Sequence, residues 1–209
     1  MTRAAHVLTL VAFILMATFV TLGSLFIAGY AFEDPGGWAA VGLVALWLVP
    51  LVVLTLVARL WADAATWLLG IGLALVTVGS IWFALDFDLW RDFMNDVGPV
   101  FGIGCFVLGL PIAMLGLRRQ LSAGLMLVIL ALMPYAAFLV GISDEPWRGV
   151  GASLTTSSTI STVPTLVVAL LYLIAAFLGH LGTRASPSEP PPQSELVATP
   201  VGAGTGSSD

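Results

Sequence analysis

The chain has 209 residues, of which 59% are hydrophobic and 9% charged, and its mean hydropathy is +1.04. A water-soluble domain cannot have this composition and still carry a solvated surface, so lipid is the expected solvent. The formal net charge of -5 excludes a nucleic-acid-binding protein, because neutralising phosphates requires a basic face. The single cysteine, Cys105, excludes an intrachain disulfide framework and a thiolate metal cluster.

Six long apolar runs predict transmembrane α-helices. Crossing the hydrocarbon layer takes roughly 20 apolar residues, and a helix pairs its backbone polar groups within such a segment. We therefore predict an all-α, polytopic membrane protein with six transmembrane helices in residues 1–183. The expected spans are residues 6–32, 38–58, 64–85, 97–117, 121–142 and 163–181.

The first and last spans each leave an alternative open. Arg3 precedes the first apolar run, as in a signal peptide. The run is about twice as long as the apolar region of a signal peptide, which favours an uncleaved anchor. Residues 149–162 are rich in Gly, Ser and Thr and are expected to form an exposed loop, although part of this segment could extend the last helix.

The positions of the arginines predict the orientation, because cations that flank a span are retained in the cytoplasm. With the N-terminus inside, five arginines are cytoplasmic and two are external, whereas the opposite topology reverses this ratio. The inner set is Arg3, Arg59, Arg118, Arg119 and Arg184, and the outer set is Arg91 and Arg148. We expect a protein of the plasma (inner) membrane with both termini cytoplasmic.

The segment 184–209 is rich in proline and poor in aliphatic residues. It cannot bury enough apolar surface to fold, so we expect a disordered cytoplasmic tail.

The predicted hairpins resemble one another. Val20–Ser24 in the first span matches Val76–Ser80 in the third, and Pro50 and Pro111 take similar places in the second and fourth. This similarity favours three tandem two-helix hairpins. Chance similarity between apolar segments of low diversity explains it equally well.

Small residues recur along one face of the helix expected at 97–117, at steps of three and four. Such a face lets helix backbones approach closely within lipid. One interpretation places this helix centrally in its own bundle. The other makes the face a contact for a second copy of the chain, giving a homo-oligomer, or for a membrane-protein partner. The residues of this small-residue face are Gly98, Gly102, Cys105, Gly109, Ala113 and Gly116.

The second outer loop, residues 86–96, reads DFDLWRDFMND. Its apolar and acidic residues separate onto two sides of a helix, which predicts a short amphipathic helix at the membrane interface with Asp88 as its N-cap. Binding of Ca²⁺ or Mg²⁺ is the alternative, but the spacing of a calcium loop is missing. The acidic residues are Asp86, Asp88, Asp92 and Asp96.

Several polar residues lie at the expected cytoplasmic ends of the helices. Arg59 and Asp63 are four residues apart and are expected to form a local ion pair. The pair Arg118-Arg119 is expected to anchor its turn against anionic lipid, with specific lipid recognition as the alternative. His6 and His180 fall in the same leaflet, and a haem or metal ligand pair is the alternative to two polar residues at helix ends.

The residues missing from the spans narrow the function. No Asp, Glu, Lys or Arg lies in the middle of any expected span, which argues against ion-coupled transport and intramembrane hydrolysis. We therefore predict a non-enzymatic structural or interaction protein that acts through helix-helix association, with the lipid bilayer as its solvent and no catalytic, metal or cofactor residues. The alternative is a passive conduit or carrier lined by the hydroxyls of Thr21, Ser24, Thr77 and Ser80. A lipid-modifying or redox enzyme with its residues in the loops is a more remote alternative.

Overall fold

The computed structural model describes residues 3–33, 37–85, 100–141 and 157–184. In the helix at residues 100–116 the side chains are described from Val107 onward, and in the helix at residues 120–141 they are described up to Met133. The described residues are helical apart from short turns and contain no strand, which confirms the all-α prediction for this part of the chain. The expected tail beyond Arg184 and the interfacial helix at 86–96 lie outside the described residues.

The bounds of the helices follow the apolar runs. Five of the helices in the described ranges begin and end within three residues of the expected spans. The helices are α1 (Arg3–Glu33), α2 (Gly37–Leu60), α3 (Ala62–Leu85), α5 (Val100–Gly116), α6 (Gln120–Gly141) and α8 (Ser157–Arg184).

Four helices are long and apolar enough to cross a membrane. The fully described apolar parts of α5 and α6, Val107–Gly116 and Gln120–Met133, are shorter. The chain is therefore a helical membrane protein by length and composition. The four candidate spans are Arg3–Phe26, Gly37–Leu60, Ala62–Trp82 and Thr162–Leu181.

Helix α8 begins at Ser157, six residues before the expected start of the last span at residue 163. The prediction of a loop is therefore wrong for residues 157–162, and the alternative of an extended helix is right. Hydroxyl side chains do not break a helix when they donate to a carbonyl one turn earlier. Thr9 and Thr55 do this elsewhere in the chain, at 2.7 Å to the Ala5 carbonyl and 2.6 Å to the Leu51 carbonyl.

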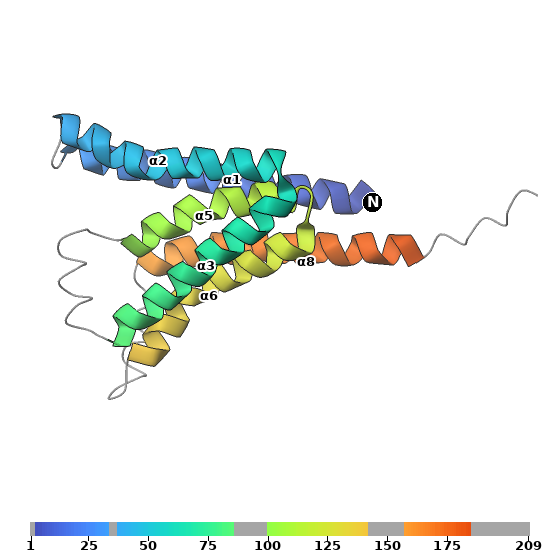
Figure 1. Ribbon diagram of the computed structural model, residues 1–209. Coiled ribbons are helices and arrows are strands. Elements are labelled where there is room, and N and C mark those ends of the chain that lie inside the picture. The colour runs from blue at the N-terminus through green and yellow to red at the C-terminus, as the bar shows by residue number, and fades with distance from the viewer. Residues whose placement is uncertain (1–2, 34–36, 86–99, 142–156, 185–209) are drawn as a thin grey trace, which may run out of the picture.

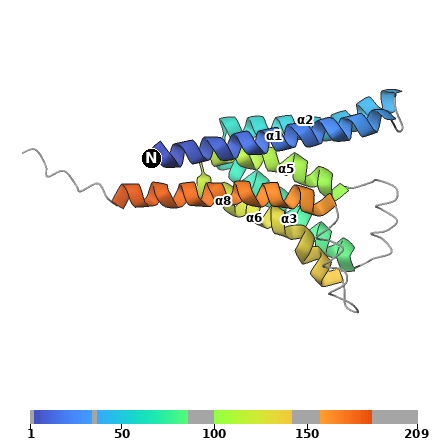
Figure 2. The same ribbon diagram turned by 180° about the vertical axis from the view of Figure 1, so that it is seen from behind.

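Helix α5 occupies the centre of the bundle. It contacts each of the other five helices in the described ranges, while α8 packs along α6 and α1. Figures 1 and 2 show α1 and α2 on one side, α3 and α6 on the other, and α5 and α8 between them. The buried core accordingly combines side chains of α5 with side chains from the helices around it, including Met16, Leu69, Ile112, Leu115, Leu127 and Tyr172.

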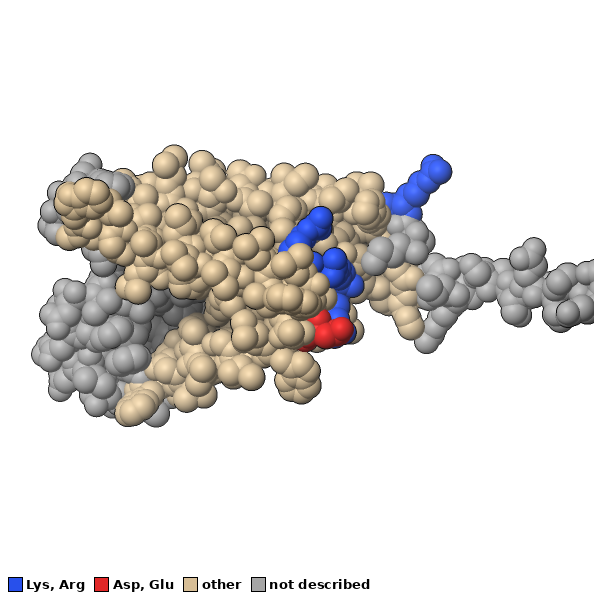
Figure 3. All heavy atoms as spheres, turned by 45° about the horizontal axis from the view of Figure 1, so that its top comes forward, with Lys and Arg blue, Asp and Glu red and all other residues tan. Residues whose placement is uncertain are grey.

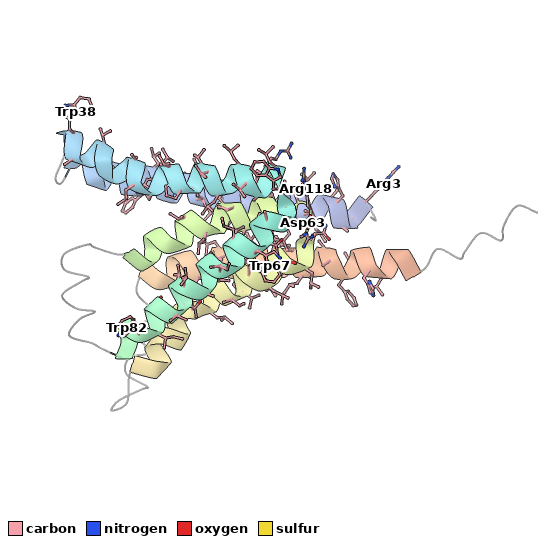
Figure 4. All side chains as sticks on the ribbon, in the orientation of Figure 1. Arg3, Trp38, Asp63, Trp67, Trp82 and Arg118 are labelled. Carbon is pink, nitrogen blue, oxygen red and sulfur yellow. The ribbon has the colours of Figure 1, made fainter. Side chains whose placement is uncertain are left out.

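Six helix ends meet at one end of the bundle. Figure 1 shows the start of α1, the corner between α2 and α3, the turn between α5 and α6, and the end of α8 all lying there. The corner is short because Trp61 is its single non-helical residue. We call this end the arginine end, because Arg3 and Arg118 lie on it (Figure 4), as do Arg59 in the last turn of α2 and Arg119 in the α5–α6 turn.

Candidate functional site: the arginine end of the bundle

The charged side chains that the structure describes lie at one end of the bundle. The charged residues whose side chains the structure describes are four arginines and Asp63, and Figure 3 shows blue and red atoms together at the arginine end. The rest of the described surface in that view consists of uncharged residues. A bundle that lies in lipid must keep its charged groups near headgroups and water, so this end is the candidate interface.

Exposed tryptophans lie toward both ends of the bundle. Trp38 is 88% exposed and Trp82 is 68% exposed, and both lie away from the arginine end (Figure 4). Trp67, which is 77% exposed, lies close to Asp63, near the arginine end. Indole rings prefer the headgroup region, so these positions fit two aromatic belts with aliphatic surface between them.

The expected ion pair between Arg59 and Asp63 is wrong. Asp63 pairs instead with Arg119, which lies in the turn between α5 and α6. Helix α2 ends at Leu60 and α3 starts at Ala62, so Arg59 and Asp63 belong to different helices and the four-residue spacing rule does not apply. Each residue complements its own helix dipole, because Arg59 is in the last turn of α2 and Asp63 in the first turn of α3.

A buried amide joins the start of α6 to α1. Gln120 is 7% exposed, and its Nε2 donates to the Thr9 hydroxyl oxygen at 2.6 Å. The Thr9 hydroxyl in turn donates to the Ala5 carbonyl at 2.7 Å. Sequence analysis did not identify this contact, and the only available signal was an amide directly after the arginine pair.

An open depression of about 460 Å³ lies between the α5–α6 turn and α8. Gly179 and Ala176 contribute little side-chain volume to its wall. Gln120, Leu121 and Ser122 of the first turn of α6 also line it, and by helix geometry their N–H groups have no acceptor within α6. The side chains that give the depression its chemistry are those of Arg118, Arg119, Ser122 and His180.

His180 therefore lies in this depression, whereas His6, the other histidine of the alternative ligand pair, is an exposed residue of α1 outside its lining. In the described part of the chain, no three His, Cys, Asp or Glu side chains gather as a metal site. The acidic residues Asp86, Asp88, Asp92 and Asp96 lie outside the described residues.

The small-residue face of α5 is partly described. A Cβ atom at Gly109 would collide with Met16 of α1, and one at Gly116 would lie 2.5 Å from Cε1 of Tyr172 in α8. The Tyr172 hydroxyl donates to the Ala113 carbonyl at 2.7 Å. This half of the face is thus covered by the chain's own helices. Gly98 lies outside the described residues, as do the side-chain surroundings of Gly102 and Cys105.

The two threonine hydroxyls of the expected conduit bond locally. Thr21 donates to the Ala17 carbonyl at 2.7 Å, and Thr77 donates to the Leu73 carbonyl at 2.8 Å. Thr77 also lies 3.2 Å from the Met133 sulfur. Within the described residues, the buried Oγ of Ser24 has no hydrogen-bond partner. Both threonine hydroxyls are therefore engaged by carbonyls of their own helices.

The chemistry available at the arginine end is therefore electrostatic attraction and hydrogen bonding to an anion. No protein-family model matches the chain, and neither a curated protein nor a solved structure matches it.

Proposed function

We propose that the chain is a six-span plasma-membrane protein with both termini cytoplasmic, and that it acts without catalysis, by association. The observation that carries this proposal is the gathering of the described charged side chains at the arginine end. Figure 1 shows the start of α1 and the end of α8 at that end, and an even number of spans would place both termini on one side of the membrane. The excess of arginine there makes it the cytoplasmic side.

The proposal counts α5 and α6 as spans. Helix α6 has 22 residues, which is enough to cross the hydrocarbon layer, and α5 has 17, near the lower limit. Helix α5 is also the most shielded from lipid, because it contacts every other helix in the described ranges. Its position supports a complete crossing, since a helix in the middle of the bundle runs alongside the four longer ones.

We further propose that association involves the arginine end more than the small-residue face of α5. The described half of that face is covered by Met16 and Tyr172, so a second copy of the chain cannot reach it without displacing them. The arginine end instead presents exposed charge and an open depression. The conduit alternative gains no support, because the hydroxyls of Thr21 and Thr77 donate to carbonyls of their own helices.

Cysteine accessibility tests this topology. In a Cys105→Ser background, single cysteines replace Ser122 at the start of α6, Gly37 at the start of α2 and Asp144 between α6 and α8. We expect a membrane-impermeant maleimide to label Gly37→Cys and Asp144→Cys on intact cells, and Ser122→Cys only after permeabilisation.

Position 122 distinguishes six spans from four. If α5 and α6 do not cross the membrane, Ser122 faces the same side as Gly37 and both are labelled on intact cells. That result would overturn the six-span proposal. Labelling of Ser122→Cys alone on intact cells would reverse the orientation instead.

A further inference from the structure

We propose that the depression between the α5–α6 turn and α8 binds the phosphate of an anionic phospholipid headgroup. This inference rests on the proposed function only for its position, since the six-span topology puts the depression at the level of the cytoplasmic headgroups. The sequence predicted a general attraction of Arg118 and Arg119 to anionic lipid, whereas this proposal assigns the lipid to a particular binding site.

Charge is the first argument for an anion. Arg118 and Arg119 both line the depression, and Arg119 forms an ion pair with Asp63, which offsets its positive charge. Within the described residues Arg118 has no carboxylate partner, and its side chain is exposed. The described residues that line the depression therefore bring a net positive charge from their arginines. A phosphate diester carries one negative charge, which Arg118 can balance.

Hydrogen-bond donors are the second argument. Helix α6 begins at Gln120, so the N–H groups of its first turn are directed out of the helix start, where anions are stabilised. The Ser122 hydroxyl and the imidazole of His180 lie in the same lining. A phosphate has several acceptor oxygens and can use several donors at once, whereas a carboxylate has only two oxygens.

The surroundings of the depression favour a lipid over a free anion. Leu121, which is 59% exposed, is part of the lining, and Leu125 follows it one turn further along α6. On α8, Phe177 is 64% exposed and Leu181 46% exposed. Acyl chains can cover these side chains while the phosphate lies in the depression.

Lipid binding to the purified full-length chain tests the proposal. Native mass spectrometry in a mild detergent would compare retention of phosphatidylglycerol and phosphatidylcholine, with inorganic phosphate as a competitor. Arg118→Gln has a matched control in Arg59→Gln, an exposed arginine at the same end that does not line the depression. His180→Gln is matched in the same way by His6→Gln.

We expect phosphatidylglycerol to be retained in preference to phosphatidylcholine. Arg118→Gln should weaken retention roughly fivefold, the usual contribution of one arginine near an anionic headgroup, and Arg59→Gln should leave it unchanged. His180→Gln should weaken it by a smaller factor than Arg118→Gln, and His6→Gln should have no effect. Asp63→Asn should strengthen it, because Arg119 then contributes its full charge.

Three results would overturn the proposal. Equal retention of the two lipids would show no headgroup selection, and equal losses in Arg118→Gln and Arg59→Gln would reduce the effect to total charge. Displacement of phosphatidylglycerol by an equal concentration of inorganic phosphate would assign the depression to a soluble anion. Unchanged thermal midpoints of the variants would exclude misfolding as the cause of a loss.

The failure of this inference is distinguishable from the failure of the topology. Selective binding does not depend on orientation, because it is measured on purified protein. Loss of selectivity with the expected labelling pattern overturns the headgroup site alone. Retained selectivity with Ser122→Cys labelled on intact cells overturns the topology alone.

Discussion

Helices α5 and α2 are both apolar and both contain an internal proline, yet they have opposite surroundings. In α5, Leu115 is fully buried, as is Ile112. In α2, Leu46 is 74% exposed and Val49 is 58% exposed. Lipid tails are as apolar as these side chains, so hydrophobicity does not draw either helix inward. In this protein, the position of a helix in the bundle depends on how closely its backbone can approach the neighbouring helices.

Glycine has different roles in the two helices. At Gly116 of α5 a Cβ would lie 2.5 Å from the ring of Tyr172, whereas at Gly42 of α2 it would meet nothing within 4 Å. The absence of a side chain in α5 lets Tyr172 cross the end of the helix and reach the Ala113 carbonyl. In α2 the same residue type leaves only lipid-exposed backbone.

The largest expected difference between the two helices comes from leucine truncation. Leu115→Ala removes packing from the centre of the bundle and should lower the free energy of unfolding by about 3 kcal/mol. Leu46→Ala should change it by less than about 0.5 kcal/mol, because that side chain contacts lipid in the folded and the membrane-inserted unfolded states alike. Denaturation by SDS in mixed micelles, followed by tryptophan fluorescence, measures both. Similar losses at the two positions would show that α5 is not central.

A smaller difference is expected from Gly116→Ala and Gly42→Ala. The added methyl group at position 116 forces the Tyr172 ring to shift and should cost about 2 kcal/mol. At position 42 the methyl group is expected to be neutral or slightly stabilising, because alanine has the higher helix propensity. The same SDS titration applies. A stabilised Gly116→Ala variant would contradict the close contact with α8.

The smallest expected effect is that of Tyr172→Phe, which keeps the ring and removes the hydroxyl. The N–H of Leu117 donates to the Met114 carbonyl at 3.3 Å, in a tightened last turn of α5. The Ala113 carbonyl therefore lacks its usual helical donor and accepts from Tyr172 instead. Loss of this bond should cost about 1 kcal/mol.

Thr21→Val serves as the control for that substitution. The Thr21 hydroxyl is exposed and donates to a carbonyl of its own helix, so its removal should change stability by much less. If both variants lost the same stability, the bond across α5 and α8 would contribute no more than a local one.

Much of the helical framework was predictable from sequence because the bilayer imposes a length. The bounds of α2, for example, lie within two residues of the expected span. The error at α8 has a local cause, since Ser and Thr were taken as loop residues although their hydroxyls can bond within a helix. The four-residue spacing rule predicted the wrong partner for Asp63, because its actual partner, Arg119, lies in a turn 56 residues later in the chain.

The similarity between the predicted hairpins does not extend to their packing. Pro50 is exposed on α2, whereas its counterpart Pro111 is buried in α5. The two helices therefore have unequal positions in the bundle despite their related patterns. Hydropathy patterns describe a helix in isolation, while burial depends on the side chains of its neighbours.

Composition and the spacing of charged residues along the chain were enough to predict a helical membrane protein, because an uncharged helix of that length can span the hydrocarbon layer and pair its own backbone groups. Tertiary packing decided which helix lies at the centre of the bundle and which carboxylate pairs with Arg119. It also brought Arg118, Ser122 and His180 together in the lining of one depression. The physical reason is that lipid and protein interior are equally apolar. Only the shapes of the helix surfaces and a few long-range polar contacts decide which side chains face the protein interior and which face lipid.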